Sequence, residues 1–158
     1  MTQLSRRSAL KSGAAVLATT ALATPAIAQG AVKWRMQALW DPGTTPLKFE
    51  EAFVKRVAEL TGGRFIIDLF SGGQIVPAAQ AFDAVRSGAF EMMKTYDGYE
   101  ADKIPAFAFT ASVPFGFPES DQYEAWFYEM GGLGMVREAC APACLFYIAP
   151  TVYGQEPI

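Results

Sequence analysis

Histidine is absent from all 158 residues of the chain, and cysteine occurs only twice. The missing histidine excludes Ser–His–Asp and Cys–His catalytic arrangements, HExxH zinc sites and a histidine proton shuttle. Two cysteines are too few for a disulfide-built scaffold or a four-thiolate metal site. Positive charge is also scarce, since 13 basic residues stand against 16 acidic residues and leave a net charge of −3. We therefore expect no nucleic-acid partner held by a basic surface.

Apolar and aromatic residues, in contrast, are plentiful. Hydrophobic residues make up 51% of the chain and aromatic residues 13%. This composition excludes a disordered or low-complexity chain, and the length corresponds to one domain or slightly more. The composition therefore favours a folded domain with a substantial core.

The first 28 residues are typical of an export signal. Arg6, Arg7 and Lys11 are followed by a run of small apolar residues, and an A-x-A cleavage pattern ends at residue 28. The apolar run is about half of the ~20 residues that a membrane-spanning helix needs. The paired arginines resemble the twin-arginine export motif, although Ala9 stands where that motif usually has Phe. We expect export to the periplasm by the twin-arginine machinery, with general secretory export as the alternative.

Strand and helix patterns alternate after this segment. Residues 32–39, 64–70 and 89–96 predict three strands, because β-favouring apolar residues gather there between turn signals. Helical patterns lie between the strands, and the second of them begins at Pro77. This β-α-β-α-β order, with short glycine-rich connections, implies an α/β fold with a parallel sheet covered by helices.

The first helix carries a clear periodicity. Thr44 or Thr45 can cap its start, and Gly62-Gly63 can end it in a left-handed conformation. Its apolar residues recur at helical spacing, so we expect one face to pack on the sheet. These residues are Phe49, Phe53, Val54, Val57 and Leu60.

The pattern becomes less regular in the last third of the chain. Residues 104–113 are almost entirely apolar and predict a buried strand or a crossover segment, and 114–118 predict a rigid aromatic loop. A helix is expected to open at 119–121, a short one to cover 135–139, and a last apolar strand to cover 145–148.

The candidate chemical motifs each have a structural alternative that is favoured. Asp97 and Asp102 flank Tyr99, but their spacing does not match a calcium-binding EF-hand loop. The loop at residues 71–73 lies between a strand and a helix, as a phosphate loop would, yet it lacks the G-x-G-x-x-G spacing and a following Lys-Ser/Thr. A tight turn is therefore the favoured interpretation of that loop.

The two cysteines leave one question open. Cys140 and Cys144 could form a disulfide after export, but Pro142 between them makes a continuous helix unfavourable. Two separate apolar thiols are the favoured interpretation. A redox enzyme would use C-x-x-C, which this spacing is not.

Aromatic residues near strand ends are the strongest functional signal. Trp40 follows the first predicted strand, and Tyr96 and Tyr99 lie at or just past the end of the third. Open α/β sheets bind ligands beyond the carboxyl ends of their strands, and aromatic side chains there supply apolar walls with hydrogen-bonding tips. The alternative is that several of these residues are ordinary core or interface packing.

Several segments together resemble the DctP-type solute-binding proteins of TRAP transporters. They are LWDPGT at 39–44, VAELTGGR at 57–64, FDAVRSG at 82–88 and ASVPFG at 111–116, with Trp126 and Gly131-Gly132-Leu133 after them. The similarity covers the chain after the signal nearly end to end. It is closest to the branch with α-keto-acid and mannitol or chloroaromatic receptors.

The resemblance implies a periplasmic solute-binding protein fold of the two-lobed, type II-like kind. The receptor would bind a small organic acid such as a 2-oxo acid, without a chemical step, and deliver it to the membrane permease subunits. After the signal at 1–28, residues 29–158 would form the front half of a longer receptor. Lobe I would cover about 30–125 and be mostly present, whereas the crossover and the start of lobe II would cover about 126–158.

The resemblance also implies particular site residues. Trp40, Tyr99 and Phe115 match ligand-contacting aromatic positions, and Gln155 matches a glutamine near both the ligand and a bound cation such as sodium. No other cofactor is expected. The Gly-Trp pair that usually follows that glutamine, and the main carboxylate-binding arginine, would lie beyond Ile158, so we expect poor binding and aggregation from the isolated chain.

Two other function classes compete with a receptor. An exported α/β structural or interaction protein without a small-molecule ligand is the alternative, because exposed aromatic residues also suit adhesion. An exported hydrolase or redox enzyme is disfavoured, because histidine and the G-x-S-x-G motif are both missing.

Overall fold

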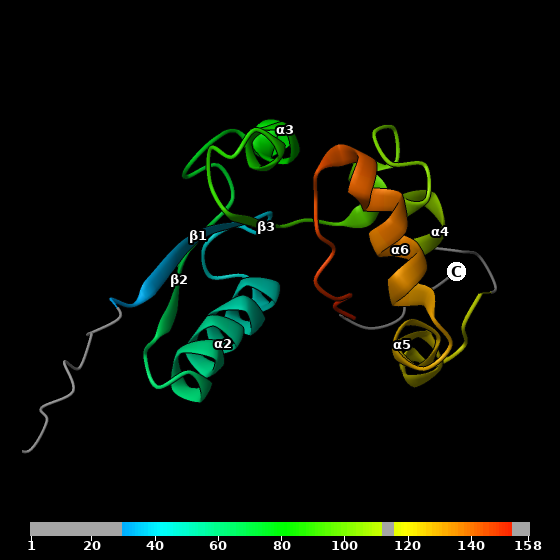
Figure 1. Ribbon diagram of the computed structural model, residues 1–158, viewed down its shortest axis with the longest axis horizontal. Coiled ribbons are helices and arrows are strands. Elements are labelled where there is room, and N and C mark those ends of the chain that lie inside the picture. Colours follow the sequence, from blue (N-terminus) through cyan, green and yellow to red (C-terminus); the bar gives the residue numbers. More distant parts are fainter. Residues whose placement is uncertain (1–29, 112–115, 153–158) are drawn as a thin grey trace, which may run out of the picture. The chain divides into compact units, whose positions relative to one another are not determined.

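A computed structural model describes residues 30–111 and 116–152 of the chain. Its sheet consists of the parallel strands β1 (Val32–Ala38), β2 (Phe65–Phe70) and β3 (Met92–Lys94), in the order β2-β1-β3 (Figure 1). The predicted parallel α/β arrangement is thus confirmed. The predicted signal at 1–28 lies outside the described residues. Among those described, no helix combines the length and apolar character needed to span a bilayer.

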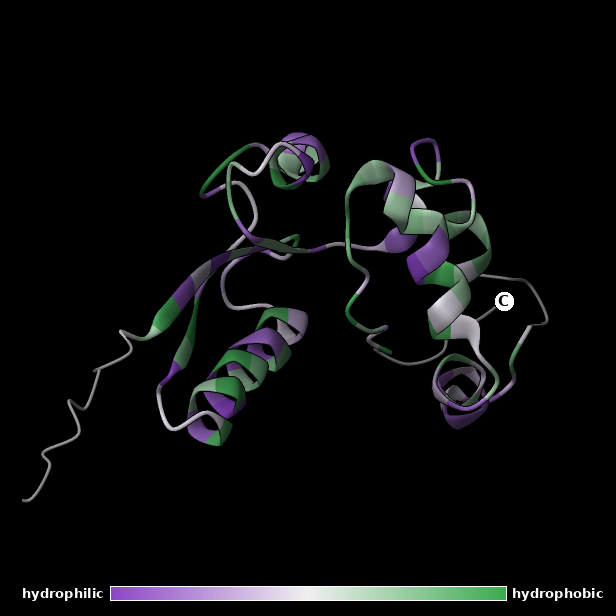
Figure 2. Cartoon of the chain, in the orientation of Figure 1, coloured by the Kyte–Doolittle hydropathy of each residue, from purple (hydrophilic) through white to green (hydrophobic). Residues whose placement is uncertain are grey.

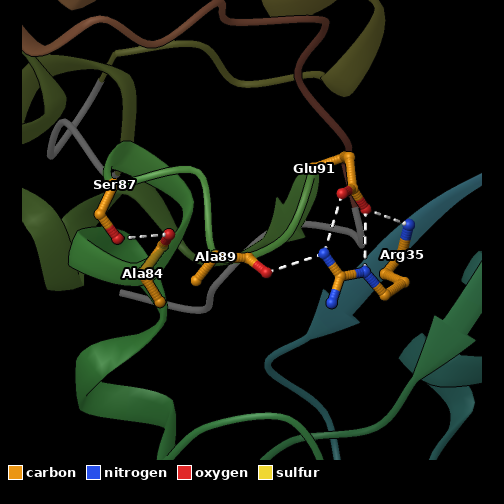
Figure 3. Close-up of polar contacts among 5 residues, drawn as sticks. All are labelled: Arg35, Ala84, Ser87, Ala89 and Glu91. Atoms are coloured by element: carbon orange, nitrogen blue, oxygen red, sulfur yellow. Dashed lines mark hydrogen bonds and ion pairs between the residues drawn. The ribbon is translucent and has the colours of Figure 1, made fainter.

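The third strand begins later than the sequence predicts, and Glu91 explains why. The Arg35 backbone N–H donates to the Glu91 carboxylate at 2.8 Å, so a side chain takes the place of a ladder hydrogen bond. The Arg35 guanidinium also donates to both oxygens of Glu91, at 3.1 and 2.9 Å, and to the Ala89 carbonyl at 2.8 Å (Figure 3). Regular pairing of β1 with β3 therefore begins only at Met92, opposite Met36.

Helix α2 (Thr45–Leu60) forms where the sequence predicts it, with Thr44 as N-cap and a proline in its first turn. The Thr44 hydroxyl donates to the Asp41 carbonyl at 2.8 Å and so braces the turn before the helix instead of capping an N–H. Gly62 and Gly63 follow the helix with φ of 58° and 74°, as the predicted left-handed end requires.

The buried face of α2 differs from the predicted one. Leu47 and Glu50 are buried, whereas Phe49, Phe53 and Leu60 are exposed. Figure 2 shows green and purple positions interspersed along α2, so apolar residues are spread around this helix. The prediction named an apolar stripe correctly but assigned three of its five residues to the wrong environment.

After β2 the chain forms a 3₁₀ turn (Ala78–Gln80) and α3 (Ala81–Arg86). The 3₁₀ helix η2 (Asp97–Glu100) comes after β3. Three further helices, α4 (Phe107–Ala111), α5 (Ser120–Tyr128) and α6 (Gly132–Cys140), lie close together (Figure 1). Buried residues from these helices, from α3 and from the segment before α4 form one core. They are Phe82, Ile104, Phe107, Phe127, Val136 and Cys140.

Helix α4 corrects the strand predicted as one option over 104–113. The run lacks the alternation that separates a strand from a helix, and no neighbouring strand is placed to pair with it among the described residues. Local bonds satisfy its backbone instead: the Phe107 N–H donates to the Ile104 carbonyl at 2.9 Å, and the Phe109 N–H donates to the Ala106 carbonyl at 3.0 Å.

The strand predicted over 145–148 is also wrong, because this segment joins no ladder in the structure. Arg137 of α6 holds it, donating to the Tyr147 carbonyl at 2.8 Å and to the Ile148 carbonyl at 2.9 Å.

The two cysteines are free thiols, in agreement with the favoured interpretation. Cys140 is buried and Cys144 is exposed.

Candidate functional site

The carboxyl ends of the three strands meet at one edge of the sheet. The Leu39 N–H donates to the Lys94 carbonyl at 2.8 Å, which joins the ends of β1 and β3. On the other side of β1, the Gly72 N–H donates to the Trp40 carbonyl at 2.9 Å. A Cβ atom at Gly72 would lie 2.5 Å from the Leu39 carbonyl oxygen, so only glycine permits this approach. The loop at 71–73 is the tight turn that the sequence favoured.

Gln37 fixes the chain that follows this loop. Its side chain is buried, and its amide oxygen accepts from the Ile75 and Val76 N–H groups at 2.8 and 2.9 Å. Its amide nitrogen donates to the Val76 carbonyl at 2.9 Å. One glutamine side chain therefore satisfies three backbone groups that are not part of the sheet ladder, and it holds this segment against β1.

The two described residues among the predicted ligand contacts both follow strands that end at this edge. Trp40 is half-buried two residues after β1. Tyr99, in η2, is 67% exposed and packs edge-on against Tyr96, with ring centroids 5.3 Å apart. A Cβ atom at Gly98 would lie 2.6 Å from the Tyr96 ring, so glycine allows this turn to fold over Tyr96. An exposed ring and a half-buried ring thus lie near the ends of neighbouring strands.

Lys94 is a charged group at this edge that the sequence reasoning overlooked. It ends β3, and burial lowers the pKa of its ammonium, whereas the negative charges of Glu50 and Asp97 raise it. Glu50 itself is buried on α2. The signal in the sequence was a lysine as the last residue of an apolar strand, but its two carboxylate neighbours come from elements that only the fold brings near it.

The residues that follow β1 and β3, with Trp40 and Tyr99 among them, form the candidate wall at this edge. The hollow next to this wall is too small to enclose a ligand. The hollow beside the strand ends holds about 10 Å³, far below the ~300–1,000 Å³ of typical ligand sites. Its lining includes Gln37, Lys94 and Thr95. A larger open groove of about 400 Å³ lies elsewhere, between Arg86, Lys103 and the end of α6, and none of the predicted ligand contacts lines it.

Two of the predicted site residues, Phe115 and Gln155, lie outside the described residues. Their predicted roles at the ligand and the cation therefore stay predictions. Within 30–111 and 116–152, no group of three or more His, Cys, Asp or Glu side chains is placed to hold a metal ion.

Comparison with protein families gives a match over most of the described chain. The model described as bacterial extracellular solute-binding protein, family 7, matches residues 36–139. A curated protein of Nostoc sp., the monocarboxylate 2-oxoacid-binding periplasmic protein, is 40% identical over 146 residues, which are 87% of this chain and 40% of that protein.

Solved structures of TRAP transporter solute-binding proteins also match. One from Bordetella bronchiseptica, with copurified calcium and picolinate in its active site, is 34% identical with a TM-score of 0.68, covering 72% of this chain and 34% of that one. One from Pseudoalteromonas atlantica, with bound sodium and pyruvate, is 30% identical with a TM-score of 0.65 over the same shares. The chain thus spans 40% of the length of the curated relative and about a third of the solved ones.

Proposed function

Because the chain belongs to the bacterial extracellular solute-binding proteins of family 7, we propose that it acts as an extracytoplasmic receptor for a small organic acid, such as a 2-oxo acid. The observation that carries this proposal is the 40% identity to a 2-oxoacid-binding periplasmic protein over nearly all of the chain. The activity is binding without a chemical step. The receptor would then deliver the acid to the membrane permease subunits of a TRAP transporter.

Trp40 and Tyr99 are the proposed contacts on the described wall. Tyr99 combines an exposed apolar ring with a hydroxyl donor, and Trp40 adds a second apolar ring. The pair suits a small acid with a short carbon skeleton and acceptor oxygens. Burial lowers the pKa of the Lys94 ammonium, and the negative charges of Glu50 and Asp97 within the fold offset this effect in part. We thus assign Lys94 a structural part and leave recognition of the carboxylate to other groups of the receptor.

Phe115 and Gln155 complete the proposed set. Phe115 would add a further apolar contact, and the amide oxygen of Gln155 would bind a cation next to the acid. Support comes from the relatives with sodium and pyruvate and with calcium and picolinate. Both cations prefer oxygen ligands, which a glutamine amide supplies.

The location and the lobes are part of the same proposal. Residues 1–28 would direct the chain to the periplasm through the twin-arginine machinery. Residues of about 30–125 would form the first lobe, and about 126–158 the crossover and the start of the second. The periplasmic name of the Nostoc relative supports this location.

A chimera tests the proposal without requiring the chain to bind by itself. Residues 29–158 replace the matching part of the Nostoc receptor, and pyruvate binding is measured by calorimetry with sodium or calcium present. We expect the chimera to bind pyruvate. The substitutions Trp40→Ala and Tyr99→Ala should each weaken this binding about tenfold or more, which corresponds to ~1.4 kcal/mol.

Residues 29–158 alone are expected to bind pyruvate only weakly, and micromolar affinity would show that expectation to be wrong.

Tyr128→Ala is the matched control, because Tyr128 is an exposed tyrosine on α5 away from the strand ends. Its affinity should equal that of the unchanged chimera. A folded chimera that binds no 2-oxo acid would remove the receptor proposal. Unchanged affinity in both site variants would remove Trp40 and Tyr99 from the site.

A further inference from the structure

The half-buried carboxylate of Asp97, two residues before Tyr99, receives hydrogen bonds from two other parts of the chain. Oδ2 of Asp97 accepts from the Thr110 hydroxyl at 2.6 Å and from the Tyr147 hydroxyl at 3.0 Å. Asp97 begins η2, Thr110 lies in α4, and Tyr147 belongs to the extended segment after α6. One oxygen atom therefore joins η2 and α4, which are consecutive, to a segment 50 residues further along the sequence.

The groups around this oxygen are themselves held in place. The Tyr123 hydroxyl of α5 donates to the Thr110 carbonyl at 2.6 Å, and Thr110 is 4% exposed. The Tyr147 ring stacks on Phe127 at 6.2 Å and 13°, and lies 6.0 Å from Phe107. The Tyr147 hydroxyl is thus aimed at Asp97 by packing on the core, which makes the bond a fixed feature and not an accident of a mobile side chain.

Four titratable groups surround the Asp97 carboxylate. Burial raises its pKa, whereas the hydrogen bonds from Thr110 and Tyr147 and the charge of Lys94 lower it. Burial also raises the pKa of Tyr123, Tyr147 and Cys140, so these three remain neutral at ordinary pH. Asp97 is consequently the group of this cluster that gains a proton as the medium turns acidic.

We propose that Asp97 is a positioning residue for solute binding, which fastens the turn that carries Tyr99 to the segment that leads toward Gln155. The inference rests on the proposed function, since it assigns those two residues to the ligand. Asp97 precedes Tyr99 by two residues, and Tyr147 precedes Gln155 by eight. Both hydroxyls share Oδ2, so the two connections depend on one acceptor atom. Removing that atom releases both of them.

Amide hydrogen exchange in the full chain tests the fastening without any ligand. Asp97→Ala and Tyr147→Phe should raise exchange over residues 145–152 at least tenfold. Asp97→Asn should not, because its amide oxygen still accepts from both hydroxyls. Asp121→Ala, which changes an exposed carboxylate of α5, is the control.

Equal exchange in all variants would overturn the fastening. Pyruvate titration of the same substitutions in the chimera then tests positioning: Asp97→Ala should weaken binding at least tenfold, and Asp97→Asn should restore it. Chimera binding that Asp97→Ala leaves unchanged overturns the positioning role and keeps the receptor. A chimera that binds no pyruvate, with the exchange pattern as expected, counts against the proposed function and in favour of the fastening.

Discussion

Single residues at the strand ends decide whether the candidate wall can form. Gly72 is the clearest case, because a Cβ atom there would overlap the Leu39 carbonyl oxygen at 2.5 Å. The same close approach allows the Gly72 N–H to reach the Trp40 carbonyl. The position of Trp40 thus depends on the absence of a side chain 32 residues later in the sequence.

Gly72→Ala should lower the free energy of unfolding by about 2 kcal/mol, because the backbone of the loop must move away from β1. Urea denaturation measures the change, and the maximum of Trp fluorescence reports on the surroundings of Trp40. Gly134→Ala is the matched control: its Cβ meets nothing within 4 Å, and it lies inside α6. That change should stabilise the protein by about 0.5–1 kcal/mol. Equal stability of Gly72→Ala and the wild type would contradict the argument.

The sequence identifies individual site residues unevenly. Trp40 and Tyr99 could be predicted as residues of the strand ends, because a strand pattern directly precedes each of them. The parts played by Lys94 and Asp97 could not, since their partners Glu50, Thr110 and Tyr147 lie in elements whose proximity depends on the tertiary fold. Whether the two predicted residues bind a ligand stays a prediction.

At the scale of elements, one ion pair extends the joint between β1 and β3 beyond their ladder of strand pairs. Arg35 and Glu91 lie 2.9 Å apart, and their side chains are partly exposed at 45% and 34%. The hydrogen bonds from the Arg35 side chain and backbone lower the pKa of Glu91 from 4.5 to about 2. A carboxyl with a lowered pKa stabilises the fold above its ordinary pKa and loses this effect as the pH falls toward the lowered value.

Glu91→Gln should therefore be less stable than the wild type at pH ~6, and this difference should shrink between pH ~4.5 and ~2. Denaturation midpoints at a series of pH values measure it. Added salt should also reduce the difference, because solvent reaches both side chains. Glu124→Gln, on the exposed side of α5, should show no comparable change. A stability difference that stays constant between pH ~6 and ~2 would show that the pair contributes no charge interaction.

Elements with a strong period could be predicted, and apolar runs without one could not. The sheet and α2 follow from alternation, helical spacing and glycine turns, and the structure confirms them. The runs at 104–113 and 145–148 are apolar in every register, so local pattern alone does not distinguish strand, helix and extended segment. In these two runs the hydrogen-bond partner of the backbone determines the structure. Local hydrogen bonds form α4, and the Arg137 side chain holds the last segment.

For the whole molecule, the amount of apolar surface is the dominant feature. Large apolar side chains of α2, α4 and α6 are exposed among the described residues, including Phe109 at 75% and Leu60 at 69%. On α2, Phe49, Phe53 and Leu60 fall within an arc of roughly 40° at 100° per residue, and so form one continuous stripe. A stripe of this kind exceeds the scattered apolar residues of an ordinary surface and favours association.

The 158-residue chain should consequently self-associate, and Phe49→Gln combined with Leu60→Gln should lower the average mass at a given concentration. Glutamine keeps the helix propensity of α2 while it removes apolar area from water contact, so the comparison isolates the stripe. Light scattering over a concentration series measures the mass. Glu51→Gln combined with Lys55→Gln changes two exposed polar residues of the same helix without altering its net charge, and should leave the association as it is. If the wild type keeps the mass of one chain at every concentration, the stripe is covered within the chain, and the exposure on which this argument depends is wrong.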